Sequence, residues 1–96
     1  MFIINLTYQV ELQKIDEYLE AHVNFLDEQY NKGYFLASGP KVPRNGGVIL
    51  ANVNETDLLE SIIAKDPFKQ NDLAVYEVTE FIPRKTSIEL EFLQNS

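Results

Sequence analysis

The sequence predicts a single α+β domain in which two helices cover one face of a four-stranded antiparallel sheet. Its hydrophobic pattern changes between a period of two and a helical period in the order β-α-β-β-α-β. Its 96 residues suffice for one core, and 45% hydrophobic with 24% charged residues is an ordinary globular balance. Because crossovers are right-handed, this order predicts a ferredoxin-like sandwich with both helices on the same face.

Four segments carry the strand pattern. Residues 2–10 alternate apolar side chains on one face and predict the first strand. Residues 34–39 and 47–53 flank the turn formers of 40–46, which predicts a hairpin with a long tip. Residues 73–81 form the fourth expected strand. We therefore expect one domain over the whole chain, with its core at about 2–83 and a tail at 84–96.

Two segments carry the helical pattern. The first runs from Leu12 to Lys32 and ends at Gly33. Its apolar stripe is expected to consist of Ile15, Leu19, His22, Leu26 and Tyr30. The second begins after Asn54, a suitable N-cap, and Asp66-Pro67 ends it because the residue before proline disfavours the helical region. The tail begins at Pro83, and a short strand is expected at 88–92.

The composition excludes several functional classes. The absence of cysteine rules out disulfides, thiolate metal sites and a cysteine nucleophile. A net charge of −7 argues against nucleic acid and anionic lipid as partners. No basic leader and no apolar run of membrane-spanning length is present, so a cytoplasmic location is expected.

One face of the predicted sheet lacks a cover of helices. Residues 48–51 are apolar on both faces, and residues 73–81 also place apolar side chains on both sides. A sheet with one face in water is expected to alternate more cleanly. An uncovered apolar face of this kind typically binds a partner, which predicts a homodimer with its sheets packed face to face.

His22 and Asp66 are the residues most able to carry chemistry. His22 is the only histidine; it is either a core residue or the one side chain suited to general acid–base catalysis near neutral pH. Asp66 either faces water or approaches another group. The topology places the start of the first helix, the hairpin tip and the loop after the second helix at one end of the sheet. An aspartate there can orient the imidazole of His22.

The cations suggest a ligand at the same end. Lys41 and Arg44 lie in the hairpin tip, Lys65 and Lys69 lie beside Asp66, and Lys14 begins the first helix. They either attract an anionic or electron-rich small molecule or are simply solvated. No phosphate loop, histidine pair or nucleophile elbow is present, so no metal or cofactor is predicted.

Together, several short motifs resemble those of the YCII (YciI-like) family over residues 2–83. They are a histidine in the middle of the first helix, Ser38-Gly39-Pro40, glycines opening the third strand, and Asp66-Pro67-Phe68. The resemblance implies ferredoxin-like subunits that form a dimeric α/β barrel, similar in fold to muconolactone isomerases. It also implies a His–Asp dyad, and one branch of the family eliminates chloride from chlorinated hydroxyquinols.

Carried over to this chain, the resemblance assigns the dyad to His22 and Asp66. Ser38, Arg44 and Phe68 are the candidate substrate-binding residues. The expected function is proton transfer in an isomerisation or elimination on a small oxygenated, ring-containing substrate, without cofactor or metal. The alternative is a module that binds a small molecule, or assembles with a protein, without turnover.

Overall fold

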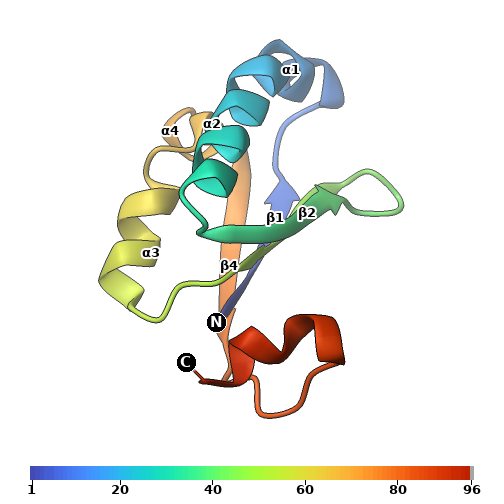
Figure 1. Cartoon of the computed structure of the whole chain (residues 1–96). Helices are drawn as coiled ribbons and strands as arrows, with labels where there is room; N and C mark the ends of the chain where they lie inside the picture. Colours follow the sequence, from blue (N-terminus) through green and yellow to red (C-terminus); the bar gives the residue numbers. More distant parts are fainter. Residues whose placement is uncertain (96) are drawn as a thin grey trace.

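The computed structural model describes residues 1–95, and its main elements follow the predicted order. The elements are β1 (Phe2–Tyr8), α1 (Leu12–Glu17), α2 (Leu19–Asn31), β2 (Phe35–Pro40), β3 (Gly46–Ala51), α3 (Thr56–Ile63), α4 (Pro67–Gln70), β4 (Ala74–Glu80) and the 3₁₀ helix η1 (Ile88–Asn95). The helices α1 to α4 lie on one side of the sheet, and η1 lies beyond its far end (Figure 1).

The four strands form one antiparallel sheet in the order β2-β3-β1-β4. This is the strand order of a ferredoxin-like sandwich, so the predicted fold class is confirmed. Leu6 on β1 pairs with Gly47 on β3 and with Tyr76 on β4. Tyr8 pairs with Ala74, and its amide donates to the Asn45 carbonyl at 2.9 Å. The end of β1, the hairpin tip and the start of β4 therefore lie together, as the topology predicted.

The core lies between the sheet and the helices. Phe2, Ile4 and Leu6 alternate along β1 toward the helices and are at most 2% exposed, whereas Ile3 faces the other side and is 37% exposed. The helical layer contributes mainly apolar side chains to the same cluster: Ile15, Phe25, Leu59, Ile62, Ile63 and Phe68. The alternation has the strand period of two, which is why the sequence pattern located this strand correctly.

The first predicted helix is interrupted at Tyr18, whose backbone (φ −107°, ψ 3°) separates α1 from α2. The interruption changes the face that α2 turns toward the core. Phe25 and Gln29 are the buried residues of α2, whereas the predicted stripe residue Leu19 is 38% exposed. His22 and Leu26 are only partly buried. The rotation therefore leaves His22 at the border of the core rather than inside it.

The second predicted helix also differs from expectation at both ends. Its N-cap is Glu55 rather than Asn54, and no side chain caps it. It ends at Ile63, and Asp66 begins a further short helix, α4, instead of only ending the previous one. A proline directly after an N-cap aspartate favours a helix start, because its fixed φ fits the first turn and its missing N–H is not needed there.

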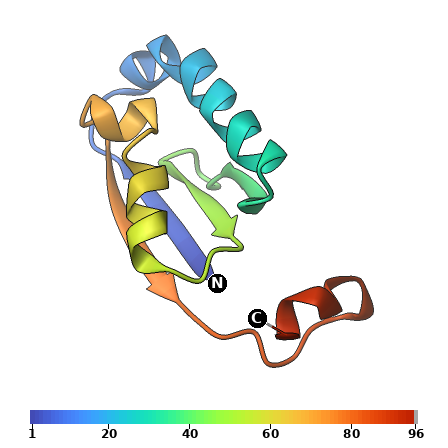
Figure 2. The same cartoon turned by 60° about the vertical axis from the view of Figure 1, so that its left-hand side comes forward.

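The tail does not form the strand expected at 88–92. These residues belong to the 3₁₀ helix η1, which follows an extended segment and lies beyond the end of the sheet away from α1 (Figure 2). The strand prediction was wrong: β4 pairs only with β1 among the described strands, and the tail adds no further strand to the free edge of β4. Within residues 1–95, no helix is long and apolar enough to cross a membrane.

Candidate active site

Asp66 is a buried carboxylate held at the start of α4. Its side chain is 1% exposed, and Oδ1 accepts a hydrogen bond from the backbone N–H of Phe68 at 3.0 Å. On the other side, Oδ2 accepts a hydrogen bond from the hydroxyl of Tyr76 at 2.5 Å. Burying a carboxylate is costly unless donors replace the lost water, and these donors fill that role.

His22 approaches the same carboxylate from α2. Its Nδ1 lies 2.8 Å from Asp66 Oδ1, and the imidazole is 12% exposed. One face of the ring stacks on Phe68, with the ring centroids 4.0 Å apart and the planes only 3° from parallel. The hydrogen bond and the stack together fix both the position and the rotation of the imidazole.

This arrangement determines which nitrogen of His22 is available. Asp66 Oδ1 is an acceptor, so Nδ1 of the neutral imidazole carries the proton and donates it to the hydrogen bond. Nε2 then has the lone pair, and none of the residues 1–95 forms a hydrogen bond with it. The imidazole lines a cavity, so Nε2 is the atom that can exchange a proton with a ligand.

The cavity has a volume of about 410 Å³ and lies between α1, α2 and one end of the sheet. Its walls are largely apolar, with a few polar groups among them. The lining residues are Leu6, Tyr8, Asp16, Leu19, His22, Val23, Leu26, Ser38, Gly39, Pro40, Arg44, Gly47, Val48, Ile49 and Phe68. A concave apolar pocket with a few polar groups is the usual form of a small-molecule site.

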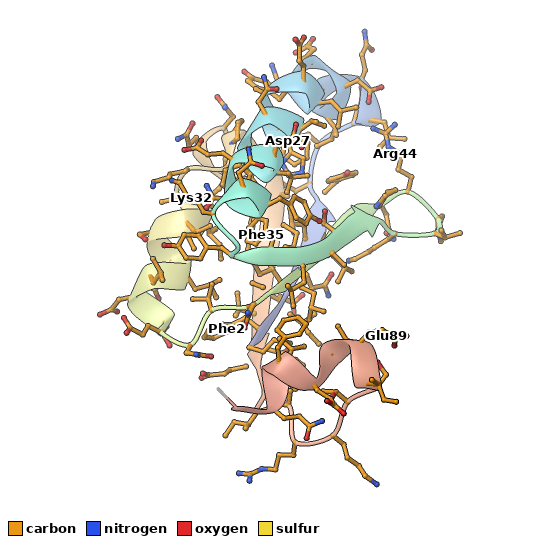
Figure 3. All side chains as sticks on the ribbon, viewed as in Figure 1. Phe2, Asp27, Lys32, Phe35, Arg44 and Glu89 are labelled. Atoms are coloured by element: carbon orange, nitrogen blue, oxygen red, sulfur yellow. The ribbon has the colours of Figure 1, made fainter. Side chains whose placement is uncertain are left out.

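The hairpin tip is tied across this cavity to α1. Arg44 Nη2 donates to Asp16 Oδ1 at 2.6 Å, and this hydrogen bond is the main cause that raises the pKa of the Arg44 guanidinium. Figure 3 shows Arg44 on the tip, extending from the hairpin toward the α1 end of the molecule. Lys41 Nζ also donates to Thr7 Oγ1 at 3.2 Å. The tip therefore bridges the two sides of the cavity.

Two of the residues that line the cavity, Ser38 and Tyr8, carry hydroxyl groups that add polar character to its walls. Ser38 Oγ on β2 and Tyr30 Oη on α2 are 2.6 Å apart and share a hydrogen bond, and Ser38 lines the cavity. Tyr8, at the end of β1, also lines it and packs edge-on against Phe68 with ring centroids 6.0 Å apart. A ligand in the cavity thus meets His22 beside hydroxyls and the Arg44–Asp16 ion pair.

Residues 1–82 match the family of the YCII-related domain. The chain belongs to this family. A search of curated proteins found no significant match to this chain. Among solved structures, its fold is similar to that of 5-chloro-2-hydroxyhydroquinone dehydrochlorinase from Burkholderia phenoliruptrix, which was solved in complex with 2,5-dihydroxybenzoquinone. The two share 20% identity with a TM-score of 0.73 over 83% of this chain and 91% of the dehydrochlorinase chain.

In this YCII domain, the five residues singled out from the sequence come together at the cavity. His22, Ser38, Arg44 and Phe68 line it, and Asp66 lies directly behind His22. Phe68 is only 1% exposed, so it supports the imidazole more than it presents a surface to a ligand.

Of the five cations expected at this end of the sheet, only Arg44 lines the cavity. Among residues 1–95, no lysine lines the cavity, and the arginine that does, Arg44, is already paired with Asp16. Lys14 pairs instead with Glu17, and Lys69 lies over the ring of Tyr76. Flexible side chains at one end of a sheet need not point to the same place, which sequence position alone cannot reveal. Among residues 1–95, no group of three or more metal-ligating side chains is gathered in one place.

Sequence reasoning missed Tyr76 and Asp16. Tyr76 has an inward position on β4, opposite Leu6, which the strand period itself indicates. A tyrosine at a core-facing position usually needs a hydrogen-bond partner, and that was the available signal. Asp16 gave no signal, because it belongs to a helix face rich in acidic residues.

Proposed function

We propose that this YCII domain is a small-molecule enzyme in which His22 transfers a proton and Asp66 orients it. The observation that carries the proposal is the 2.8 Å hydrogen bond from Nδ1 to the buried carboxylate, with Nε2 left available at a cavity. A structural histidine would be enclosed by Leu19, Leu26 and the sheet. This imidazole instead lines the cavity, which supports the catalytic interpretation.

The proposed chemistry is an isomerisation or an elimination. In both, Nε2 removes a proton from a carbon or hydroxyl activated by a neighbouring carbonyl, and the imidazolium is stabilised by Asp66. In an isomerisation the same proton returns to another atom of the substrate. In an elimination a new double bond forms while the leaving group departs with its bonding electron pair, and the imidazolium later gives its proton to water. Neither route requires a cofactor or a metal.

The expected substrate is a small, oxygenated molecule that contains a ring. The apolar walls suit a flat carbon skeleton, and the hydroxyls of Tyr8 and Ser38 and the guanidinium of Arg44 suit its oxygen substituents. The ring of 2,5-dihydroxybenzoquinone in the structurally similar dehydrochlorinase supports a ligand of this size and type. Arg44 is available to a ligand carboxylate or enolate if that group replaces Asp16.

A second candidate function is binding without turnover. The polar groups around the cavity are largely paired with one another, Arg44 with Asp16 and Ser38 with Tyr30. Such pairing leaves Nε2 as the main unpaired polar atom, which would suit a sensor or a carrier. The two candidates differ in one respect: only the enzyme requires the proton on Nε2 to move.

Substitution of His22 distinguishes these functions. Small hydroxylated quinones, hydroquinones and lactones would be screened for binding by thermal shift and for turnover by absorbance and, for chlorinated members, chloride release. We expect His22→Ala to reduce turnover by roughly 10²-fold or more while binding is retained. Asp27→Asn, an exposed substitution on the same helix and outside the cavity lining, is the control and should behave like the native protein.

Two results would count against the enzyme. Turnover that persists in His22→Ala would remove the histidine from the mechanism. Tight binding by the native protein without conversion of any compound would favour the binding module.

We also propose that the domain acts as a homodimer. The helices cover one face of the sheet, and the opposite face carries exposed apolar side chains, among them Ile3, Val48 and Val75. A second copy of the chain is the partner that fits such a face, since both surfaces are then the same and apolar.

A further inference from the structure

The carboxylate of Asp66 is held on its far side by Tyr76. Tyr76 lies on β4 and pairs with Leu6 of β1, so its side chain is on the helix-covered face of the sheet. Its hydroxyl donates to Oδ2 of Asp66, while Oδ1 accepts from the Phe68 amide and from His22. Each of the two carboxylate oxygens therefore has its own donors, and they come from α2, α4 and β4.

We propose that Tyr76 is a positioning residue of the site, which holds the Asp66 carboxylate toward His22 and sets the basicity of the imidazole through it. The inference rests on the proposed function, in which His22 is the group that moves the proton. Tyr76 is not among the residues that line the cavity. It therefore acts through Asp66 and not on the ligand.

The hydroxyl of Tyr76 can serve only as a donor here. Burial raises the pKa of Tyr76 far above its ordinary value, and the negative charge of Asp66 raises it further. The phenol thus stays protonated throughout the neutral pH range. A protonated donor beside a carboxylate stabilises the anion and draws negative charge from the oxygen that faces the imidazole.

The direction of the effect follows from this charge distribution. When the hydroxyl is removed, Oδ2 loses its donor and the carboxylate becomes a stronger acceptor for a proton on His22. The imidazolium is then favoured, so His22 should titrate at a higher pH. An amide in place of the carboxylate has the opposite effect, because no negative charge remains to stabilise the imidazolium.

Other charged and titratable groups surround this chain of contacts. Lys69 of α4 lies 5.4 Å from the centroid of the Tyr76 ring, and Tyr8 of β1 contributes to the raised pKa of Tyr76. The Arg44–Asp16 ion pair lies at the cavity. Tyr76→Phe leaves all of these groups in place and keeps the aromatic ring under Lys69. A change in the titration of His22 therefore reports the loss of the hydroxyl alone.

The chain is well suited to the test because it has one histidine. In protein labelled with ¹⁵N-histidine, the two ring nitrogens give the tautomer and the titration midpoint directly by NMR. We expect the native protein to show a proton on Nδ1 at high pH. We expect Tyr76→Phe to raise the midpoint by about 0.5 to 1 pH unit and Asp66→Asn to lower it.

Tyr34→Phe is the matched control. Tyr34 is also partly buried against the core, is outside the cavity lining, and its hydroxyl has no hydrogen-bond partner among residues 1–95. Loss of this hydroxyl should leave the titration of His22 unchanged. Thermal unfolding of both variants separates a general loss of stability from the specific shift.

Several outcomes would overturn the proposal. A midpoint that is unchanged in Tyr76→Phe, or that falls, would show that the hydroxyl does not act on His22 through Asp66. A proton on Nε2 in the native protein would do so without any variant. An unchanged or lowered midpoint leaves the proposed enzyme intact, because that proposal fails if turnover survives in His22→Ala or is absent from the native protein. A proton on Nε2 would count against both proposals, since Nε2 would then lack the lone pair that removes the substrate proton.

Discussion

At the scale of single residues, the site depends on one buried carboxylate. Asp66 is placed in a largely apolar region, where an unpaired charge would be strongly destabilising. The Phe68 amide, the Tyr76 hydroxyl and the His22 imidazole compensate for this burial. Removing any one of them leaves a polar atom of Asp66 with fewer partners. The residues that orient the histidine are therefore also residues that stabilise the fold.

The raised pKa of Tyr76 predicts a specific loss of stability at alkaline pH. The unfolded chain ionises Tyr76 near its ordinary value of 10.0, while the folded protein keeps it protonated to higher pH. The folded state therefore binds more protons above pH 10, so the stabilisation is complete below that pH and decreases as pH rises. We expect the free energy of unfolding of the native protein to decrease more steeply than that of Tyr76→Phe above pH 10. The difference should approach about 1.4 kcal/mol per pH unit.

Urea unfolding of both proteins between pH 8 and 11 measures this difference. Contributions from the other tyrosines and the lysines are common to the two proteins and cancel in the comparison. The prediction would be contradicted if the free energy of unfolding depended on pH in the same way in the native protein and in Tyr76→Phe.

At the scale of elements, the strands β2 and β3 determine where the hairpin tip lies relative to the cavity. Its second strand begins at Gly46, where a Cβ atom would lie 1.9 Å from the carbonyl oxygen of Leu6. The backbones of β1 and β3 approach closely at this point because Gly46 has no side chain. This approach sets where the tip leaves the sheet and therefore where Arg44 can reach Asp16.

We expect Gly46→Ala to destabilise the protein by roughly 3 kcal/mol or more, because backbone atoms must move to admit the methyl group. Gly39→Ala on the neighbouring strand is the control. A Cβ atom at Gly39 meets nothing within 4 Å, and we expect a cost below about 1 kcal/mol. Thermal or urea unfolding of the two variants tests the prediction, and equal costs would show that the close approach is not restrictive.

The helices and strands also show how much of the secondary structure could be predicted from the sequence pattern. The first strand was predicted correctly because its side chains alternate with a period of two, and the two hairpin strands because turn formers separate them. The break at Tyr18 was missed because the apolar pattern continues through it, and only packing against the sheet rotates α2. Asp66-Pro67 was interpreted as a helix end, although the same dipeptide can begin a helix; the choice depends on tertiary contacts.

The same limit applies to the site. The shared end of the sheet followed from topology, so His22 and Asp66 could be expected to be near one another. The stack of His22 on Phe68 and the hydroxyl of Tyr76 depend on side-chain directions that the sequence does not reveal. Because of those directions, Arg44 lines the cavity and none of the lysines in the described part of the chain does.

At the scale of the whole molecule, the sheet has one covered and one uncovered face. Ile3 pairs with Leu50 across β1 and β3, and Thr7 pairs with Val75 across β1 and β4, all on the face away from the helices. Ile3, Val48 and Val75 are between 37% and 48% exposed there. Exposed apolar side chains therefore occur on β1, β3 and β4 of this face, where their contact with water is unfavourable.

The homodimer is therefore the prediction at this scale. Sheets that pack face to face should bury more than about 1,200 Å² in total, enough for a stable dimer at micromolar concentration. Light scattering or sedimentation should then give a mass of twice 11.1 kDa.

Val75→Lys places a charge on the uncovered face and should yield a folded monomer, because an unpaired charge in an apolar interface is strongly unfavourable. Val42→Lys, at a hairpin-tip position that is 98% exposed, is the matched control and should remain dimeric. A native chain that stays at 11.1 kDa would contradict the dimer, and the apolar face would then need a different partner.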